Sequence, residues 1–218
     1  MTTEELQNTA AQLRQPSGED GIKTADWMNK GNLYFNLDTL KVVNAQANDN
    51  ILEIGMGNGF FVKDILHIHP SIHYTGCDFS ELMVAESVKL NSEWIDKKQA
   101  SFIEADAASL PFESNLFNKI FTINTIYFWE NPNKVLSEIL RVLQPNGKFI
   151  IGIRPKHQME KYPFTQYGFQ LYSKENLSEI LTQNGFKILE IIENNEPDFE
   201  NNGLIFKMEN VIIVCFKV

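Results

Sequence analysis

The sequence predicts an α/β protein: a doubly wound, mostly parallel, seven-stranded sheet with a C-terminal antiparallel hairpin and an N-terminal helical cap. Three observations support this fold class. From residue 50 onward, short apolar runs alternate with helix-like patterns, and the runs are almost continuously hydrophobic, as in parallel strands covered on both faces. A glycine-rich turn directly follows the first run. The residues before 50 contain helical patterns and no strand pattern.

Residues 1–48 are expected to form the cap, a lid over the sheet. Thr2 and Glu5 have the spacing of a helix capping box, and apolar residues follow them at helical intervals. Residues 15–21 have the composition of a loop, and one or two short amphipathic helices are expected beyond them. Residues 49–218 are expected to form a single compact domain.

The elements of this larger domain alternate along the chain. Strands are predicted from the apolar runs at 51–54, 72–77, 101–104, 119–123 and 148–153. Helical periodicity falls near 60–68, 81–98, 132–143 and 174–184, and Gly185 is placed to end the last of these helices. Two further β-rich runs, 186–193 and 204–218, have only residues 194–203 between them. That connection is too short for a helical crossover, so we expect the two runs to pair antiparallel.

Composition and charge narrow the class of protein. Of the 218 residues, 43% are hydrophobic and 22% are charged, which is ordinary for a globular protein with a full core. The net charge of −9 argues against nucleic-acid binding and against attraction to anionic membrane surfaces. The N-terminus has no signal-peptide pattern and no apolar run is long enough to span a bilayer, so we expect a cytoplasmic protein without a membrane span.

The cysteines and histidines predict neither a disulfide nor a metal site. Cys77 and Cys215 lie in apolar, strand-like runs and are expected to be buried free thiols. His67 and His69 stand at a predicted helix end, where exposed positions are expected. His157 follows the fifth predicted strand and is the histidine expected near the cleft.

The segment Ile51-Leu-Glu-Ile-Gly-Met-Gly-Asn-Gly59 is the most informative stretch of the chain. Glycine permits a positive φ and removes the Cβ that would keep a ligand away from the main chain. A helix that begins just beyond offers unpaired N–H groups and the positive end of its dipole. Glu53 lies at the carboxyl end of the strand, where it can face a cation. The segment therefore suits a ligand that has both a negative and a positive group.

Further polar residues follow the next predicted strands, at the edge of the sheet where doubly wound folds bind ligands. Asp78 follows the second strand, where a carboxylate can accept hydrogen bonds from a ribose diol. Asp106 follows the third strand and Asn124 the fourth. Each has a simpler explanation, since Asp78 and Ser80 also suit a helix cap and Asp106 a turn. Because all of them fall at strand ends, we favour the joint functional interpretation.

The glycine spacing discriminates between nucleotide classes. A dinucleotide fingerprint requires Gly-x-Gly-x-x-Gly, and counted from Gly55 its third position is Phe60. No Gly-Lys-Ser/Thr follows, which excludes the phosphate loop of nucleoside triphosphatases. A cofactor that joins an adenosine to an amino acid group, without phosphate, agrees better with the pattern. A nucleotide-dependent oxidoreductase is the disfavoured alternative.

Four motifs follow one another along the chain: Ile51-Leu-Glu-Ile-Gly-Met-Gly-Asn-Gly59, Gly76-Cys-Asp-Phe-Ser-Glu-Leu-Met83, Asp106-Ala-Ala-Ser-Leu-Pro-Phe112 with Phe117-Asn-Lys-Ile120, and Glu138-Ile-Leu-Arg-Val-Leu-Gln-Pro-Asn-Gly-Lys148. In this order they make the chain similar to the class I S-adenosylmethionine-dependent methyltransferases. It is most similar to the small-molecule type with the methyltransferase domain 11 pattern. The similarity covers residues 50 to about 155 and implies a Rossmann-like fold. It also implies S-adenosylmethionine as cofactor, with S-adenosylhomocysteine as product.

Two positions depart from the family pattern. Asn118 stands where the family usually has Asp, and the usual Pro-Gly-Gly reads Pro145-Asn-Gly147. Asparagine tolerates the left-handed turn conformation, so neither change affects the predicted cofactor site.

The resemblance implies how the methionine end of the cofactor would be held. Glu53 and the backbone of the glycine loop would bind its ammonium and carboxylate groups. Asn124, at the end of the fourth strand, would lie beside the transferable methyl group. The loop residues expected at this end are Gly55, Met56, Gly57 and Gly59.

The adenosine end would lie against the second and third strands. By the same resemblance, Asp78 would accept hydrogen bonds from the ribose, and Phe79 and Met83 would lie against the adenine face. Asp106 would accept from the adenine amino group, and the N–H of Ala107 would donate to the ring.

A sulfonium already activates the methyl group, so alignment of the acceptor and exclusion of water are the main requirements. An acid or base is needed only where the acceptor must lose a proton, and Tyr127 and His157 are the candidates for that role. An aromatic-lined pocket favours a small, partly apolar acceptor, although the same rings also suit simple packing between lid and sheet. The expected pocket residues are Trp27, Asn29, Asn32, Tyr34, Tyr127, Trp129 and Tyr162.

The sequence therefore predicts methyl transfer from S-adenosylmethionine to a small molecule. A non-catalytic or partner-activated S-adenosylmethionine-binding protein is the alternative. Nucleic-acid methylation is disfavoured, because the fourth strand ends in Asn124-Thr-Ile-Tyr127 rather than in the Asn-Pro-Pro-Tyr of relatives that methylate base amino groups.

Overall fold

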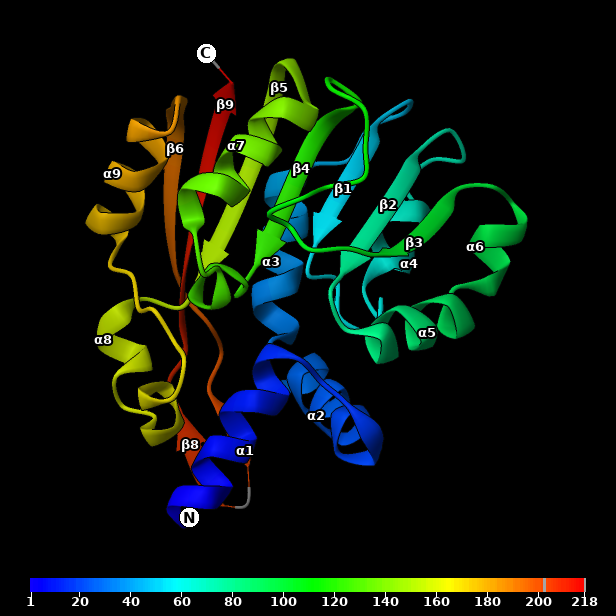
Figure 1. The fold of residues 1–218 in the computed structure, drawn as a ribbon. Coiled ribbons are helices and arrows are strands. Elements are labelled where there is room, and N and C mark those ends of the chain that lie inside the picture. Colours follow the sequence, from blue (N-terminus) through cyan, green and yellow to red (C-terminus); the bar gives the residue numbers. More distant parts are fainter. Residues whose placement is uncertain (202, 218) are drawn as a thin grey trace.

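The computed structural model describes residues 1–201 and 203–217. At its centre is a seven-stranded sheet in the order β3-β2-β1-β4-β5-β9-β6 (Figure 1). The strands are β1 (Asn50–Ile54), β2 (His73–Asp78), β3 (Ala100–Glu104), β4 (Phe117–Ile123), β5 (Leu143–Ile153), β6 (Phe186–Asn195) and β9 (Glu209–Lys217). Strands β1 to β5 pair in parallel, and β9 runs antiparallel to both β5 and β6. The predicted fold class is confirmed.

The C-terminal hairpin differs from the prediction in its connection. Strands β6 and β9 pair antiparallel as expected, but the predicted strand 204–218 is divided. A second, two-stranded sheet of β7 (Phe199–Asn201) and β8 (Leu204–Phe206) lies between β6 and β9. The short apolar stretch at 204–206 therefore pairs locally instead of extending β9.

Three helices precede the sheet: α1 (Thr3–Arg14), α2 (Gly18–Gly31) and α3 (Leu33–Val43). The capping box of α1 is confirmed, since the N–H of Glu5 donates to Oγ1 of Thr2 and the N–H of Thr2 donates to the Glu5 carboxylate. The expected loop at 15–21 is wrong beyond Ser17, because α2 already begins at Gly18. The acids at 19 and 20 fall in its first turn, where the helix dipole favours negative charge.

The remaining helices lie between or after the strands. They are α4 (Val62–Leu66), α5 (Glu81–Leu90), α6 (Ser92–Asp96), η1 (Ile126–Phe128), α7 (Pro132–Val142), α8 (Lys156–Met159), η2 (Pro163–Gln166) and α9 (Lys174–Gln183). The helix predicted at 81–98 is thus two helices, with Asn91 between them. Ser80 caps α5 by accepting from the N–H of Met83, and Gly185 follows α9 with φ of +85°. Strand β5 begins five residues before the predicted Lys148, where Leu143 pairs with Phe117 across a register shift.

Helices cover both faces of the sheet (Figure 1). Apolar residues of α7 and α9 form one core cluster with β4, β5 and β9, and those of α3, α4 and α6 form the other. Phe35 of α3 lies directly against Gly152 of β5, where a Cβ would come within 2.7 Å of its ring. Helix α3 therefore belongs to the cover of the sheet, while α1 and α2 lie beyond the carboxyl ends of the parallel strands. The division into a cap at 1–48 and a domain at 49–218 stays a prediction.

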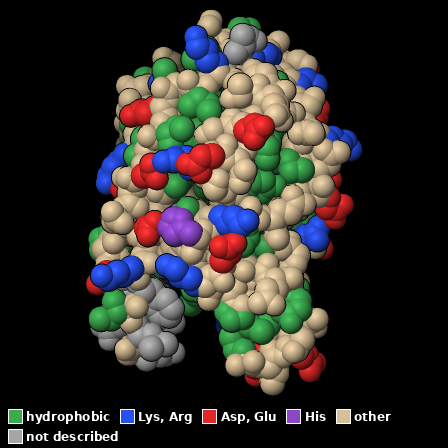
Figure 2. All heavy atoms as spheres, turned by 90° about the vertical axis from the view of Figure 1, so that its left-hand side faces the viewer, with side chains coloured by type: hydrophobic (Ala, Val, Ile, Leu, Met, Phe, Trp, Pro, Cys, Tyr) green, Lys and Arg blue, Asp and Glu red, His purple; other side chains and the backbone are tan. Residues whose placement is uncertain are grey.

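Charge is distributed without a continuous basic surface on the face shown in Figure 2, where acidic and basic side chains alternate over β6, α8 and α9. Within residues 1–201 and 203–217, no helix combines the length and apolar character needed to cross a bilayer. Cys77 and Cys215 are both buried free thiols, as predicted.

Candidate functional site

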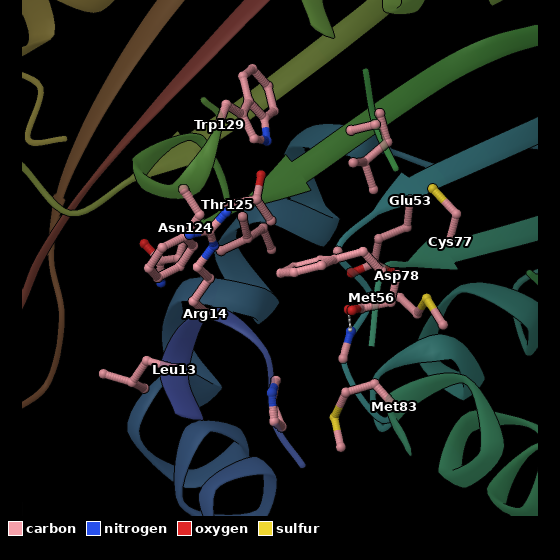
Figure 3. Close-up of a pocket in the computed structure, with 18 of the residues that line it drawn as sticks. Leu13, Arg14, Glu53, Met56, Cys77, Asp78, Met83, Asn124, Thr125 and Trp129 are labelled. Atoms are coloured by element: carbon pink, nitrogen blue, oxygen red, sulfur yellow. Dashed lines mark hydrogen bonds between the residues drawn. The ribbon is translucent and has the colours of Figure 1, made fainter. Parts of the chain in front are cut away.

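The main cavity lies at the carboxyl ends of the parallel strands, where the strand order reverses between β2, β1 and β4. Its volume is about 490 Å³, within the range of small-molecule sites. Glu53 and Asp78 lie on one side of the open space, and Asn124 and Trp129 on the other (Figure 3). The predicted cofactor residues that line it are Glu53, Gly55, Met56, Gly57, Asp78, Phe79, Met83, Asp106, Ala107 and Asn124.

Glu53 is a buried acid at the end of β1. Its Oε2 accepts a hydrogen bond from the Tyr74 hydroxyl at 2.5 Å. Burial raises the pKa of Glu53 to about 7; the Tyr74 hydrogen bond opposes this rise, and the nearby Asp78 adds to it. Among the described residues, no lysine or arginine pairs with this carboxylate. A ligand cation in the cavity would therefore stabilise its ionised form.

Asp78 is held in one orientation by backbone hydrogen bonds. The N–H of Gly57 donates to Oδ2 at 3.1 Å, and the N–H of Ser80 donates to Oδ1 at 2.9 Å. Burial raises the pKa of Asp78 to about 6, although these backbone hydrogen bonds oppose the rise. Each oxygen still has acceptor capacity for a ligand hydroxyl.

The three glycines of the loop have different surroundings. A Cβ on Gly57, which has φ of +58°, would meet nothing within 4 Å and would stand in open space. A Cβ on Gly55 would come within 2.3 Å of the Thr125 side chain. Gly59 does not line the cavity; its carbonyl instead accepts a hydrogen bond from Asn91 at 3.0 Å. Gly57 is thus the position where the backbone itself borders the cavity.

The residues expected around adenine lie at the ends of β2 and β3. Phe79 is half-exposed and Met83 is fully buried in α5, and both line the cavity. Oδ1 of Asp106 accepts from the N–H of Ala108 at 2.8 Å, so Asp106 also has the turn role considered from the sequence. Both interpretations of Asp106 remain compatible with its position, since it lines the cavity as well.

The connection between α1 and α2 lies against the same cavity. The Gln15 side chain donates to the carbonyl of Phe79, and the Ser80 hydroxyl donates to the carbonyl of Pro16 at 2.6 Å. On the other side, Arg14 pairs with Glu130 at 2.8 Å. Three polar contacts thus join the end of α1 to both sides of the cavity.

A second cavity of about 290 Å³ adjoins the first. Leu13, Met28, Asn32, Asn124 and Phe128 line both. Of the predicted acceptor-pocket residues, the second cavity contains Trp27, Asn32, Tyr127 and Tyr162, and the first contains Asn29, Asn32 and Trp129. Tyr34 lines neither cavity and is 44% exposed.

The two candidates for proton transfer are placed very differently. The Tyr127 hydroxyl lies 3.0 Å from the carbonyl of Arg154 and 3.1 Å from Oδ1 of Asn124, and it accepts from the N–H of Arg154. Burial raises the pKa of Tyr127 far above its usual value, so its hydroxyl stays protonated. Its hydrogen bonds to the backbone of Arg154 give it a structural role. His157 lies in α8 rather than in a loop, is exposed, pairs with Glu209 at 2.9 Å and lines neither cavity.

Arg154 is a site residue that the sequence reasoning missed. Arg154 directly follows the apolar run of β5. Its position, a charged residue at the carboxyl end of a buried strand, is the feature of the sequence that could have indicated it. Its guanidinium is buried and binds both carboxylate oxygens of Glu196, at 2.9 and 3.2 Å. It also donates to the carbonyl of Gly31 and to Oδ1 of Asn32, so it fixes the end of α2 to the sheet.

Comparison with known proteins identifies the domain. Residues 52–151 match the family model described as "Methyltransferase domain". Residues 52–151 carry a methyltransferase domain. It is 27% identical over 125 residues to "Uncharacterized methyltransferase YdaC" of Bacillus subtilis, a match that covers 57% of this chain and 67% of the relative. It is 31% identical over 137 residues to "Demethylmenaquinone methyltransferase" of Lactococcus lactis, with 62% and 53% covered.

The fold of the methyltransferase domain and its helices also has solved counterparts. A chain of the complex between the Haloferax volcanii Trm112 methyltransferase activator and a methyltransferase superposes with a TM-score of 0.77 at 17% identity, covering 98% of this chain and 97% of that one. The curated relatives are matched over 38% to 67% of their own length. The cavity agrees with S-adenosylmethionine, the cofactor of this family. Asp78 lines the cavity with a fixed carboxylate, and no described lysine or arginine pairs with Glu53. At Gly57 no side chain separates the backbone from the cavity.

Proposed function

We propose that the protein transfers a methyl group from S-adenosylmethionine to a small, partly apolar molecule. The proposal rests on the adjacency of two cavities that share five lining residues: an acid- and glycine-lined one at the strand ends lies beside an aromatic one. The donor and the acceptor would thus meet beside Asn32 and Asn124, which line both.

Three residues of the first cavity would contact the cofactor. Glu53 faces the cofactor ammonium, Asp78 the ribose hydroxyls and Gly57 the methionine carboxylate. When bound, S-adenosylmethionine would supply a methyl group on a sulfonium. A lone pair of the acceptor would bond to the methyl carbon as the carbon–sulfur bond breaks, and the electron pair of that bond would stay on the sulfur of S-adenosylhomocysteine. Helices α1 and α2 cover the meeting point and limit the access of water. Orientation of this kind contributes ~7–11 kcal/mol in favourable cases, so an acid or base is needed only where the acceptor must lose a proton.

The named relatives support a small acceptor. One is a demethylmenaquinone methyltransferase and others are O-methyltransferases of Aspergillus sclerotiorum and Pyrenophora dematioidea. The acidic net charge, and the mixture of acidic and basic side chains on the face shown in Figure 2, agree with an acceptor other than nucleic acid.

Calorimetric titration with S-adenosylhomocysteine and with NAD tests the proposal. We expect S-adenosylhomocysteine to bind and NAD not to bind. Asp78→Ala should weaken S-adenosylhomocysteine severely, whereas Asp64→Ala, which removes an exposed acid of α4, should not. Unchanged affinity in a folded Asp78→Ala protein excludes this cofactor site, and binding of NAD alone favours an oxidoreductase.

A partner-activated protein is the second candidate. The solved chain that covers almost all of this one was determined in a complex with a methyltransferase activator. If the present protein needs such a partner, it should bind S-adenosylhomocysteine but transfer no methyl group to any acceptor of a broad panel until a cell extract is added. Turnover by the purified chain alone excludes this candidate.

A further inference from the structure

The second cavity has a chemical character of its own. Its aromatic wall centres on Phe169, whose ring centroid lies 4.6 Å from Phe128, 5.7 Å from Phe164 and 6.0 Å from Tyr127. Three methionines also line it: Met28, Met159 and Met208. Thioethers are polarisable and adapt to the shape of an apolar partner. Its volume of about 290 Å³ is close to the lower end of the range for ligand pockets, so it can hold a small ligand.

The cavity offers no free charge to that ligand. Arg154 is the charged side chain that lines it within the described part of the chain. The side chains of Arg154 and Glu196 are 5% and 2% exposed, and each oxygen of Glu196 accepts from the guanidinium. Three further acceptors surround the guanidinium, the carbonyls of Gly31 and Glu209 and the amide of Asn32. A buried charged group on a ligand would therefore lack a counter-charge, which costs several kcal/mol.

Two amide side chains stand where the cavities meet. Oδ1 of Asn32 already accepts from Arg154 at 3.1 Å and from Asn124 at 3.4 Å. Among residues 1–201 and 203–217, Nδ2 of Asn32 makes no hydrogen bond, and Nδ2 of Asn124 makes only the long contact to Asn32. Both amides can therefore donate further. The two amides can thus donate hydrogen bonds to a ligand that lies in the second cavity and extends one end into the first.

We propose, on the basis of the proposed function, that the second cavity binds the uncharged, apolar body of the methyl acceptor. The acceptor is a neutral ring or short chain that carries one hydrogen-bond-accepting atom, and the amides of Asn32 and Asn124 hold that atom at the junction. Acceptors that bury a carboxylate, a phosphate or a quaternary ammonium group in this cavity are excluded.

A matched pair of fluorescent probes tests the charge preference. N-phenylnaphthylamine is neutral, and anilinonaphthalenesulfonate has the same rings with one added sulfonate. We expect the neutral probe to bind the purified chain, to remain bound at saturating S-adenosylhomocysteine, and to bind at least about tenfold more tightly than the anionic one. Equal affinity of the two probes, or displacement of the neutral probe by S-adenosylhomocysteine, overturns the proposal. Displacement by phenyltrimethylammonium also overturns it, because the rings would then form a cage for a cation.

Two substitutions locate the bound probe. Met159→Trp adds volume inside the cavity and should weaken N-phenylnaphthylamine about tenfold, whereas Leu189→Trp, on the exposed edge of β6, should not. Glu196→Gln removes the counter-charge of Arg154 and should reduce or reverse the preference against the sulfonate. Circular dichroism and S-adenosylhomocysteine affinity report whether each variant is folded. A folded Met159→Trp protein with unchanged probe affinity places the probe elsewhere and contradicts the proposal.

The outcomes separate this inference from the proposed function. Binding of S-adenosylhomocysteine without binding of the neutral probe removes the apolar acceptor site and leaves the methyltransferase assignment intact. Binding of the neutral probe without S-adenosylhomocysteine removes the proposed function, and with it the role of the cavity as an acceptor site.

Discussion

The hydroxyl of Tyr74 on β2 donates a hydrogen bond across the strand pair to the carboxylate of Glu53 on β1, with 2.5 Å between Oη and Oε2. Glycine at position 76 makes this contact possible. Glu53 pairs with Gly76 in the register of the two strands, and a Cβ on Gly76 would come within 3.1 Å of the Tyr74 hydroxyl. The tyrosine ring therefore occupies the space left by Gly76 and reaches the end of β1. The Tyr74 hydroxyl thus partly stabilises the ionised carboxylate of Glu53, the group proposed to face the cofactor ammonium.

Tyr74→Phe should shift the pH dependence of cofactor binding. The hydrogen bond from Tyr74 lowers the pKa of Glu53, so its loss should raise that pKa above about 7 and leave more of the acid protonated at neutral pH. We expect S-adenosylhomocysteine to bind several-fold more weakly at pH 6.5–7 and close to normally at pH 8.5, as measured by calorimetry across this range. Tyr34→Phe, outside both cavities, is the control. Parallel profiles for Tyr74→Phe and the parent protein would show that Glu53 ionisation does not govern binding.

Glu53→Gln should stabilise the ligand-free protein at high pH and not at low pH. The pKa of Glu53 is raised above its ordinary value of 4.5 to about 7, so its favourable contribution is complete below pH 4.5 and is lost as pH rises through 7. Glutamine does not ionise, so the variant should gain up to roughly 3 kcal/mol relative to the parent between pH 5 and pH 8. Thermal unfolding at both pH values measures this gain.

The same Glu53→Gln variant should bind S-adenosylhomocysteine more weakly, because it offers no negative charge to the ammonium. Glu113→Gln, at an exposed position, serves as the control for both measurements. A variant that is less stable than the parent at pH 8 would mean that ionised Glu53 already has a stabilising partner in the free protein.

The sequence predicted that Gly57 and Asp78 lie at one cavity because their signals are local. Gly57 needs a positive φ and open space beside it, and Asp78 follows a continuous apolar strand, so each is recognisable from its neighbours in the chain. Parallel strands then bring such ends together at one edge of the sheet, and the cavity indeed contains both residues. The fold could be predicted for the same reason, since every strand of the main sheet has its own apolar run.

Trp27, Asn32, Tyr127 and Tyr162 line the second cavity as expected, but Arg154 could not be predicted there because its contacts are distant in sequence. Arg154 meets Glu196 and Asn32, which lie in other elements, and no local pattern signals such pairs. The predicted strand at 204–218 was wrong for a different reason: residues 204–206 pair locally with 199–201 in a separate small sheet. His157 was expected near the cleft, but the loop in which it was placed forms a short helix that exposes it.

Gly57→Val should abolish cofactor binding without unfolding the protein. The added side chain meets no protein atom within 4 Å and instead occupies the cavity, although the φ of +58° adds some strain. Gly168→Val is the matched control, because Gly168 has φ of +78°, is equally unobstructed and lines neither cavity. We expect similar losses of melting temperature in both variants and loss of S-adenosylhomocysteine binding in Gly57→Val alone. Binding that survives in Gly57→Val would move the cofactor away from the glycine loop.

Lys119→Met should destabilise the protein without changing the site. Nζ of Lys119 lies 2.7 Å from Oδ2 of Asp49, and the Asn118 side chain donates to the other oxygen at 2.6 Å. Burial would raise the pKa of Asp49, but these hydrogen bonds outweigh it and hold the pKa below its usual value. Loss of the lysine leaves a buried carboxylate unpaired, which typically costs about 3–5 kcal/mol and should appear in urea unfolding.

The pair lies just before β1 and at the start of β4, at the opposite edge of the sheet from the cavity. The folded fraction of Lys119→Met should therefore bind S-adenosylhomocysteine with normal affinity. Lys119→Met combined with Asp49→Asn removes the unpaired charge and should recover part of the stability. A single variant as stable as the parent would show that the ion pair only offsets its own desolvation, while weakened cofactor binding would reveal coupling between the two edges of the sheet.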